Sequence, residues 1–515
     1  MNVLLLSMPD SFEHMPTVAV RMPNGALSSL AGNIDTHHRV AIGDLVLAQT
    51  SVTDTVVRLV REFEPHVVGL SVMTFQRATA FKIARLIRRL RPSTVIVAGG
   101  YDPSLAPDVY ATEDEIDFLI RGEGERTLRE LLRALERHAG FSGVAGLSYR
   151  ENGVMRHNPD RAIAHLATDP LELPRRDVRV LDGYTLLGRK VDVVETSRGC
   201  TYDCSFCSII EMRGRNFHTF SIERVLADIA DARRHGAEAI FLVDDNITLD
   251  VHRFEALCEA IIESGLHTIE YFVQAMTAPL AQYGATLAPL MRRAGFRYVF
   301  LGIENVLDED LVFLKARAKN AKRQGGKTVG NATIDAINHL HRHGMFVVGG
   351  LIVGNPDDTS ESIDANLKFA KQYVDWPYIQ HPTPYPRTPM TKEFRERGLI
   401  VDEDVAHYDG TTAVVRTEHV EANDVEFLRW RAERWIKLQH FPSAFIHSPG
   451  FVMRHGWRML AHTFAGSSIR SMLGLESERT VFERFRAARR SEKDYVRVEA
   501  PVFSGPAPDG LQTAP

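Results

Sequence analysis

The sequence is poor in cysteine, with only four in 515 residues. So few cysteines argue against a disulfide-stapled scaffold and indicate a reducing compartment. The chain has no apolar run of about 18 residues, the length that a membrane span needs. The short apolar run at residues 2–8 lacks the basic segment of a signal peptide, and Pro9 and Asp10 end it. We therefore expect a cytoplasmic protein.

Strong charge of either sign is also missing. The net charge is −5, with 44% hydrophobic and 25% charged residues, which is ordinary for a globular protein. This balance gives no reason to expect a nucleic-acid partner. No internal repeat is visible, and the length predicts two or three domains.

Three of the four cysteines gather in one short stretch. Cys200, Cys204 and Cys207 follow the spacing Cys-x3-Cys-x2-Cys. Three thiolates on one loop are typical of an iron–sulfur cluster. The alternative is a structural zinc site, which usually needs four closed ligands, and no second cysteine pair exists here. The fourth cysteine, Cys258, falls on an apolar helix face and is expected to be a buried free thiol.

Strands and helices alternate along the first 140 residues, which is typical of a parallel α/β sheet. The run at 2–8 is continuously apolar, as expected for a parallel strand buried on both faces. Further strands are predicted at 40–48, 66–73, 94–100 and 117–120, and helices at 53–63, 78–90 and 128–138. We predict a doubly wound, flavodoxin-like domain over 1–140.

Ligands of such sheets bind at the carboxyl ends of the strands. Glycines there let the backbone approach a bulky ligand closely. The candidate binding residues at these ends are Ser71, Met73, Thr74, Gly99, Gly100, Tyr101, Gly122, Glu123 and Gly124.

A connector is expected at 141–190, with a hairpin turn at the Asn-Gly pair 152–153. From 191 to 387, six strands alternate with helices, which predicts a partial (β/α)6 barrel with its site at the carboxyl ends of the strands. The strands are predicted at 191–196, 239–246, 270–275, 298–304, 345–354 and 375–381, and the helices at 221–235, 251–263, 287–294, 332–343 and 360–372. The run 315–327 is expected to be a solvated basic loop.

The cysteine spacing, with the aromatic Phe206 before the last cysteine, resembles the signature of the radical SAM superfamily. The resemblance implies a [4Fe-4S] cluster on Cys200, Cys204 and Cys207, with one iron free to chelate S-adenosylmethionine (SAM). Reductive cleavage of SAM then gives a 5′-deoxyadenosyl radical. The resemblance also implies SAM-binding residues at the strand ends, namely Phe206, Asp244, Asp245, Asn246, Gln274, Glu304, Gly350, Ile352 and Gly354.

The first 140 residues resemble the cobalamin-binding domain that precedes many radical SAM domains. The strand Val68-Gly-Leu-Ser71, the pair Gly99-Gly100 and the turn Arg121-Gly-Glu-Gly-Glu125 carry this resemblance. No Asp-x-His-x-x-Gly motif is present, so we expect cobalt without a protein histidine ligand. His37 and His38 are expected to be exposed loop histidines.

The region 388–500 is predicted to be mainly helical, with a helix at 423–441, and 501–515 to be a disordered tail. Between Arg429 and Arg490, twelve Lys and Arg residues stand against four Asp and Glu, interleaved with tryptophan and phenylalanine. One interpretation is a helical cap over the barrel mouth with a solvated basic face. The other is peripheral contact with the inner face of the membrane.

Together the two resemblances imply a cobalamin-dependent radical SAM methyltransferase of the type that methylates unactivated carbon. One SAM methylates cob(I)alamin, and a second yields the radical that activates the substrate. We expect a hydrophobic small-molecule substrate, with a polycyclic lipid such as a hopanoid as the leading hypothesis, and a reductase or flavodoxin-type electron donor. The alternatives are a cobalamin-dependent cyclase or rearrangement enzyme, and a non-catalytic cobalamin-binding sensor.

Overall fold

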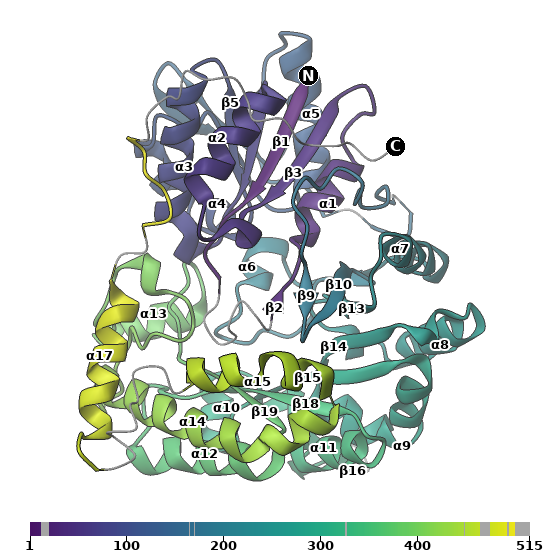
Figure 1. Ribbon diagram of the computed structural model, residues 1–515, viewed down its shortest axis with the longest axis vertical. Coiled ribbons are helices and arrows are strands. Elements are labelled where there is room, and N and C mark those ends of the chain that lie inside the picture. Colours follow the sequence, from purple (N-terminus) through teal and green to yellow (C-terminus); the bar gives the residue numbers. More distant parts are fainter. Residues whose placement is uncertain are drawn as a thin grey trace.

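The computed structural model describes residues 1–11, 20–163, 165–168, 170–324, 327–447, 449–463, 474–491 and 494–499. Two β-sheets organise the chain, each with helices packed against it. Figure 1 shows the first sheet in purple and blue above the second in teal and green. The expected tail at 501–515 lies outside the described residues.

The first sheet has the order β3-β1-β4-β5-β6-β7-β8. Its strands are β1 (Asn2–Ser7), β3 (Arg39–Asp44), β4 (Val67–Ser71), β5 (Val95–Gly99), β6 (Phe118–Ile120), β7 (Leu147–Glu151) and β8 (Val154–His157). The first five strands in this order pair in parallel. The strand β7 pairs antiparallel with β6, and β8 pairs antiparallel with β7. Numbered along the chain, the five parallel strands stand in the order 2-1-3-4-5. This is the strand order of a flavodoxin-like sheet. The predicted doubly wound fold is confirmed.

Helices cover both faces of this sheet. They are α1 (Gly25–Gly32), α2 (Val52–Phe63), α3 (Arg77–Leu90) and α5 (Gly124–Glu136). Leu4 and Leu6 of β1 pack in the core with α2 and α3, whereas Val3 and Leu5 face the core formed with α1 and α5. Both faces of β1 are therefore buried, as its continuous apolar run predicts. The sequence analysis did not anticipate α1.

The hairpin predicted in the connector is present. Asn152 and Gly153 join β7 to β8 with positive φ angles of 52° and 79°. Two positive φ values in a two-residue loop are the requirement of a type I′ turn, and an Asn-Gly pair meets it. The hairpin extends the first sheet on its far edge.

The second sheet has the order β19-β18-β15-β14-β13-β10-β9-β2. Its strands are β19 (Trp376–Gln380), β18 (Phe346–Ile352), β15 (Phe296–Glu304), β14 (Glu270–Met276), β13 (Ala239–Leu242), β10 (Arg189–Val194), β9 (Thr185–Leu186) and β2 (Val20–Arg21). The first six are parallel and form the predicted partial barrel. The strand β2 comes from the N-terminal part of the chain and pairs with β9, so the N-terminal part supplies strands to both sheets.

Helices cover the outer face of the partial barrel. They are α7 (Ile222–Arg234), α8 (Val251–Glu263), α9 (Thr277–Ala294), α11 (Thr333–Arg342) and α12 (Ser360–Tyr373). The helix predicted at 287–294 is wrong in extent, because α9 begins ten residues earlier and contains Pro289 in its interior. Leu280, Leu287 and Met291 are fully buried in the barrel core. Their packing compensates for the hydrogen bond that a proline inside a helix removes.

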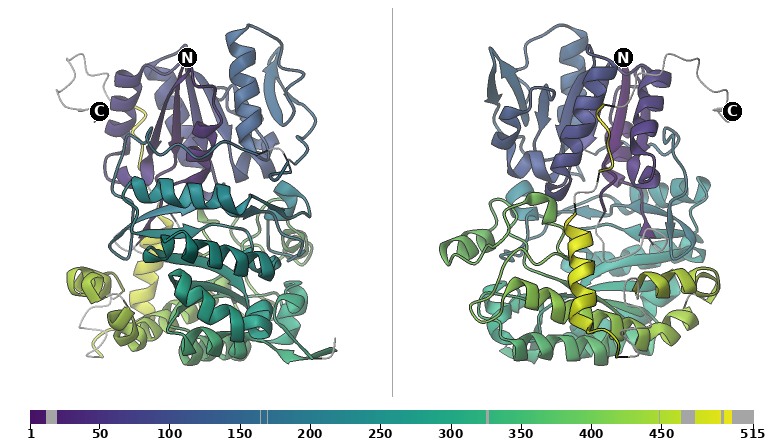
Figure 2. Two further views of the ribbon diagram at one scale, coloured as in Figure 1. Left: turned by 90° about the vertical axis from the view of Figure 1, so that its right-hand side faces the viewer. Right: turned by 60° about the vertical axis from the view of Figure 1, so that its left-hand side comes forward.

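The C-terminal region is helical, as predicted. It comprises α13 (Pro389–Glu396), α14 (Ala422–His447), α15 (Pro449–Thr463) and α17 (Glu478–Arg490). Helix α14 packs along the edge strand β19, where Arg429 donates to the Ile379 carbonyl at 2.7 Å. Figure 2 shows α14 and α15 beside the lower sheet and α17, in yellow, standing upright along the lower half of the molecule. Among the described residues, no helix combines the length and apolarity of a membrane span.

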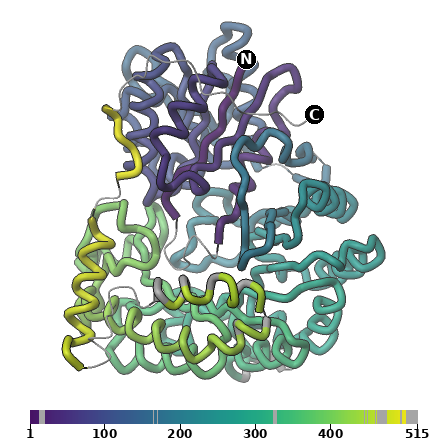
Figure 3. The backbone as a smooth tube through the Cα atoms, viewed as in Figure 1, coloured from purple at the N-terminus to yellow at the C-terminus, as the bar shows by residue number. Residues whose placement is uncertain are grey.

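Residues 494–499 return from α17 to the first sheet. Val496 is 2% exposed and packs in the core formed with α2 and α3. The Arg497 amide donates to Thr53 Oγ1 at 2.9 Å, and Arg89 donates to the Val498 carbonyl at 2.8 Å. Figure 3 shows this segment in yellow along the purple N-terminal helices. The C-terminal part of the chain therefore ties the two halves together.

Short elements complete the structure. They are α4 (Tyr101–Leu105), α6 (Ile209–Arg213), α10 (Asp308–Phe313), β11 (Ser197–Arg198), β12 (His218–Thr219), β16 (Ala321–Gln324), β17 (Lys327–Asn331) and the 3-10 turns η1 (Leu45–Ala48), η2 (Thr74–Gln76), η3 (Pro107–Thr112), η4 (Ile247–Leu249), η5 (Leu266–Thr268), η6 (Arg317–Lys319) and η7 (Val405–His407). The predicted strand 40–48 therefore ends at Asp44 and continues as η1.

Candidate active site

The cysteine loop follows β10 at the carboxyl edge of the barrel. Cys200, Cys204 and Cys207 line a cavity of about 650 Å³ there. Burial raises the pKa of Cys204 to about 12 and that of Cys207 to about 11. A bound metal must therefore displace the thiol protons, as metal–thiolate formation does. Cys258 lies fully buried in α8, in the barrel core, as predicted.

The spacing of the three sulfur atoms argues against a single zinc ion. Sulfur ligands of one tetrahedral zinc lie about 3.8 Å apart, given Zn–S bonds of about 2.3 Å. Among the described residues, the only group of three or more metal-ligating side chains with all ligand atoms within 4.8 Å is His37, His38 and Glu136. The cysteine sulfurs are therefore more widely spread, as a four-iron cubane requires, and the donor set fits a [4Fe-4S] cluster.

Most of the predicted SAM-binding residues surround the cysteine cavity. It is lined by Phe206, Asp244, Asp245, Asn246, Gln274, Glu304, Gly350 and Ile352. Gly354 does not line it. The Gly354 amide donates to Asp358 at 2.8 Å, and its positive φ of 99° marks a turn. The strand ends therefore bring together all the predicted SAM-binding residues except Gly354.

Asp244 lines the cavity, but its carboxylate accepts hydrogen bonds from the residues that lead into the cysteine loop. Its carboxylate accepts the Thr196 amide at 2.6 Å and the Ser197 hydroxyl at 2.6 Å, and its side chain is buried. Burial raises the pKa of Asp244 to about 6, against the hydrogen bonds that lower it. Both of its oxygens already accept hydrogen bonds from the protein, and SAM binding by Asp244, Asp245 or Asn246 stays a prediction. Asp245 accepts the Gly199 amide at 2.7 Å, while Asn246 lies 3.8 Å from the Cys200 sulfur.

Lys319 lines the cavity and was missed by the sequence analysis. Its Nζ lies 2.5 Å from Glu304 Oε1, and both side chains are largely buried. Burial alone would lower the pKa of Lys319, but the Glu304 carboxylate raises it above its usual value. The expectation of a solvated basic loop at 315–327 is therefore wrong at this position. No sequence pattern marks Lys319, because only the barrel brings it back to the end of β15.

A second cavity of about 320 Å³ lies at the carboxyl edge of the first sheet. Of the predicted cobalamin-binding residues, it is lined by Ser71, Met73, Gly99, Gly100, Tyr101, Gly122, Glu123 and Gly124. Thr74 does not line it and is buried in η2. A Cβ atom at Gly100 would lie 2.9 Å from the Val72 carbonyl oxygen, and φ there is +105°. Gly100 therefore lets the backbone lie close to Val72. A Cβ atom at Gly122 would meet only the Met212 carbonyl oxygen, at 3.9 Å, so the backbone there leaves room for a broad ligand such as the corrin ring.

No histidine is among the residues that line this second cavity. His37 and His38 precede β3 at its amino end, whereas the cavity lies at the carboxyl ends of the strands. His37 pairs with Glu136 at 3.0 Å and is exposed, but His38 is only 3% exposed. The prediction of an exposed His38 is wrong, because the N-terminal strand packs over it.

The two cavities meet at one residue. Tyr101 lines both the cysteine cavity and the glycine-rich cavity. Arg213 of the glycine-rich cavity also pairs at 2.9 Å with Asp245 of the cysteine cavity. A ligand bound above the first sheet would therefore face a ligand bound on the cysteine loop.

Comparison with known families agrees with this geometry. Residues 15–132 match the B12 binding domain, and residues 194–370 match the radical SAM superfamily. The chain is a cobalamin-binding radical SAM protein. Its cofactors are cobalamin, SAM and a [4Fe-4S] cluster.

Several characterised and uncharacterised relatives share this architecture. An uncharacterised methyltransferase of Pyrococcus horikoshii is 27% identical over 471 residues, which cover 90% of this chain and 99% of the relative. The anaerobic magnesium-protoporphyrin IX monomethyl ester cyclase of Synechocystis sp. is 25% identical over 452 residues, covering 85% and 84%. The hopanoid C-3 methylase of Methylococcus capsulatus is 27% identical over 311 residues, covering 59% and 56%.

Solved structures share the fold of this radical SAM protein. The radical SAM methyltransferase TsrM from Kitasatospora setae, with cobalamin and a [4Fe-4S] cluster bound, superposes with a TM-score of 0.63 at 19% identity, covering 78% of this chain and 79% of TsrM. The cobalamin-dependent radical enzyme OxsB, with aqua-cobalamin and SAM bound, also gives 0.63 at 18% identity, covering 85% and 66%.

Proposed function

We propose that this protein is a methyltransferase that moves a methyl group from SAM, through methylcobalamin, to an unactivated carbon atom. The observation that carries the proposal is the junction of the two cavities at Tyr101. A methyl donor above the first sheet and a radical source on the cysteine loop must both reach one substrate carbon, and adjoining cavities allow this. When bound, the cluster and SAM supply a carbon radical, and cobalamin carries the methyl group.

The chain itself binds and orients the reactants. Cys200, Cys204 and Cys207 hold the cluster, and Asp244 fixes the backbone of the preceding loop through Thr196 and Ser197. The ion pair of Lys319 with Glu304 provides fixed charges in the wall of the cavity, where Lys319 Nζ lies 5.9 Å from the centroid of the Phe206 ring. Fixed charges in a cavity that excludes water need no rearrangement during the reaction.

Anaerobic turnover with SAM that carries a deuterated methyl group tests the proposal. A metabolite extract from cells that lack the protein supplies the unmethylated substrate. We expect one compound to gain the deuterated methyl group while 5′-deoxyadenosine forms. Formation of 5′-deoxyadenosine with no labelled methyl product would contradict methyl transfer.

The second candidate function is oxidative cyclisation, which the cyclase relatives favour. In that case the same experiment yields an unlabelled product that has lost hydrogen. A cobalamin-binding sensor would form neither 5′-deoxyadenosine nor product. The methyltransferase relatives from Pyrococcus and Methylococcus make methylation the stronger candidate.

The substrate we propose is a mostly apolar small molecule, with a hopanoid-like polycyclic lipid as the leading candidate, delivered from a membrane surface. A set of apolar side chains stands exposed on the α14–α15 pair: Trp435, Leu438, Phe445, Ile446, Met453 and Trp457. Trp457 is 80% exposed and Met453 78%. Large apolar side chains beside basic ones suit the interface of an anionic membrane. A reductase or flavodoxin-type protein supplies the electron.

Vesicle flotation tests the membrane contact. The double variant Met453→Gln, Trp457→Gln should lose binding to anionic vesicles, whereas Val154→Gln, which changes an exposed side chain of β8 on the first sheet, should retain it. High salt should weaken the binding, since it screens the basic residues. Equal flotation of the double variant and the wild type would contradict a membrane role for α15.

A further inference from the structure

The inner face of the partial barrel is divided into two layers. Because side chains alternate along a strand, every second residue of each strand points inward. Toward the cysteine cavity, the inward positions are more polar and carry fewer rings: Gln274, Met276, Gly302, Glu304, Gly350, Ile352 and Gln380. The lower layer consists of large apolar side chains: Phe241, Phe272, Tyr298, Phe300, Val348, Trp376 and Tyr378. The register places them side by side, as Phe272 with Tyr298 and Val348 with Trp376.

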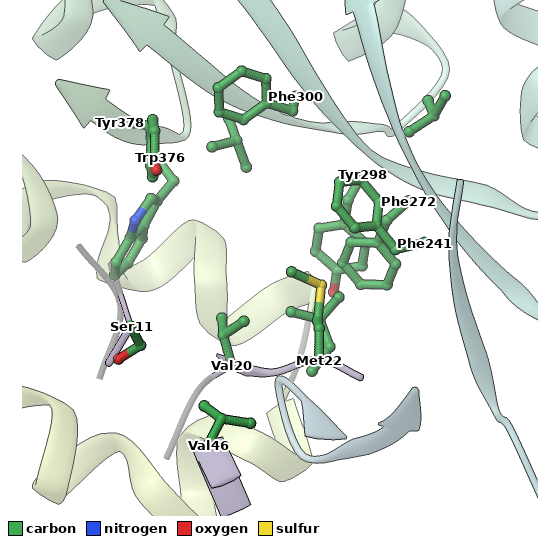
Figure 4. A pocket seen from close by; sticks show the side chains of 13 residues that line it. Ser11, Val20, Met22, Val46, Phe241, Phe272, Tyr298, Phe300, Trp376 and Tyr378 are labelled. Atoms are coloured by element: carbon green, nitrogen blue, oxygen red, sulfur yellow. The ribbon is translucent and has the colours of Figure 1, made fainter. Parts of the chain in front are cut away.

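The lower layer encloses a pocket of about 350 Å³. Figure 4 shows Phe241, Phe272 and Tyr298 on one side and Trp376 and Tyr378 on the other. The pocket is closed opposite the sheet by Val20, Met22 and Val46, from β2 and η1 of the N-terminal half. Close-packed protein interiors rarely leave spaces much larger than a water molecule, so a pocket of this size has room for a small ligand.

The pocket carries no charge. None of its thirteen lining residues is acidic or basic. The adjoining cysteine cavity, in contrast, has Asp245, Glu304 and Lys319 in its walls. Burying a charged ligand group in the lower pocket would leave it without a partner, which is costly. The pocket therefore selects a neutral, apolar ligand.

The pocket opens into the cysteine cavity. Met22, Phe241, Phe300 and Tyr378 line both. Two aromatic pairs shape this region: Phe272 and Tyr298 stack with ring centroids 4.2 Å apart, and Phe300 meets Tyr378 edge-on at 5.2 Å. Such rings present broad flat faces, which pack well against other flat or fused rings. A ligand that fills the pocket reaches the cysteine cavity with one end.

We propose that this pocket binds the unreactive body of the substrate, a neutral fused-ring hydrocarbon, and so selects which carbon is exposed to the cofactors. This assignment rests on the proposed methyl transfer. The reacting end of the substrate lies where this pocket opens into the cysteine cavity, near Phe300 and Tyr378. The rest of the molecule lies in the pocket. Trp376 lines the far wall of the pocket. The Nζ atom of Lys437 on α14 lies 5.6 Å from the centroid of the Trp376 ring, which connects the pocket to the α14–α15 surface.

Pocket-filling substitutions test the proposal, with pyrene as a neutral four-ring probe. Val348→Trp fills the pocket from the barrel wall, and Val20→Trp fills it from the opposite side at the edge strand β2. The matched control is Ile334→Trp, which adds the same side chain at a 40% exposed position on α11. Cluster and cobalamin content of each purified holoenzyme reports whether it has folded. We expect pyrene binding at least tenfold weaker in both filled variants and unchanged in the control.

Pyrene that binds both filled variants as tightly as the wild type would overturn the assignment, as would failure to bind the wild type at all. A sulfonated pyrene of the same ring size should not compete. The outcome for methyl transfer is read separately, with the labelled-SAM assay. Full methyl transfer by both filled variants would overturn the role of the pocket while leaving the proposed function intact. Normal pyrene binding with no methyl transfer by the wild type would instead contradict the proposed function.

Discussion

The Arg198 guanidinium donates to the Glu125 carboxylate at 2.7 Å and so joins the cysteine loop to the first turn of α5. Glu195 lies at 2.7 Å and Glu123 at 3.4 Å from the same guanidinium. Arg198 and Glu125 are both almost fully buried. Burial alone would raise the pKa of Glu125, but Arg198 lowers it to about 2. Arg198 stands two residues before Cys200, and Glu123 lines the glycine-rich cavity. This contact therefore sets the two cofactor sites relative to each other.

Replacing Arg198 should strongly destabilise the protein. Arg198→Met leaves three carboxylates without their buried partner, and breaking a buried pair in this way costs about 3–5 kcal/mol. The free energy of unfolding from chemical denaturation measures the loss. Arg175→Met removes an exposed arginine whose partner Asp177 is also exposed, so its effect should stay below about 1 kcal/mol. Equal losses in both variants would show that the Arg198 network contributes no more than a surface pair.

The cysteine triad should be indispensable for the cluster. Cys200→Ala, Cys204→Ala and Cys207→Ala should each lose bound iron and the formation of 5′-deoxyadenosine, since each removes one of three ligands. Cys258→Ala should retain both, because Cys258 packs in the barrel core away from the cavity. Iron and sulfide analysis with anaerobic SAM cleavage provides the measurement. Retained cleavage in any triad variant would contradict the ligand assignment.

The adjacent glycines Gly99 and Gly100 should respond differently to substitution. At Gly99 a Cβ atom finds ordinary contacts at 3.6 Å, so Gly99→Leu should fold and crowd the cobalamin cavity, weakening cobalamin binding at least tenfold. At Gly100 φ is +105° and ψ is −160°, a region that essentially only glycine occupies, so a side chain adds backbone strain on the order of 1–3 kcal/mol besides the close contact with the Val72 carbonyl. Gly100→Leu should therefore also lower the melting temperature.

Gly143→Leu is the control for this pair, because a Cβ atom there meets nothing within 4 Å. Cobalamin content after reconstitution, measured by absorbance, and thermal unfolding separate the two effects. Wild-type cobalamin binding by Gly99→Leu would contradict the position of the corrin ring.

Stability should fall between about pH 4 and pH 7 because of Asp310. Burial, with repulsion from Asp358 next, raises the pKa of Asp310 to about 7. In the unfolded chain an aspartate titrates near 3.9, so between these values the folded protein holds a proton that the unfolded chain has released. The free energy of unfolding then decreases as pH rises, by up to roughly 4 kcal/mol at about 1.4 kcal/mol per pKa unit.

Asp310→Asn should remove most of this pH dependence, since the amide is neutral throughout. Asp308→Asn is the control, because the Asp308 side chain is 63% exposed. Denaturant titrations at several pH values give the comparison. A pH profile that is unchanged in Asp310→Asn would contradict the assignment.

Much of the architecture follows from local patterns in the sequence. The continuous apolar run of β1 and the Asn-Gly turn at 152–153 depend on neighbouring residues alone, and both predictions are confirmed. The cysteine spacing also predicts the cluster loop from local sequence, because all three cysteines lie on one short segment. The helix at 287–294 was predicted too short because a proline was given more weight than the buried face that outweighs it.

The contacts between residues that lie apart in the sequence came only from the tertiary structure. Lys319 reaches Glu304, and Arg198 reaches Glu125, across 15 and 73 residues of sequence. Asp244 is an acidic residue at a strand end, as expected of a ligand-binding residue. In the structure, however, both of its carboxylate oxygens accept hydrogen bonds from Thr196 and Ser197. The apolar pocket likewise combines five barrel strands with β2 and η1 from the N-terminal half. Residue type and local periodicity determine which helices and strands form and which chemical groups are available. Which side chains then meet in space depends on packing between distant segments, which no local pattern encodes.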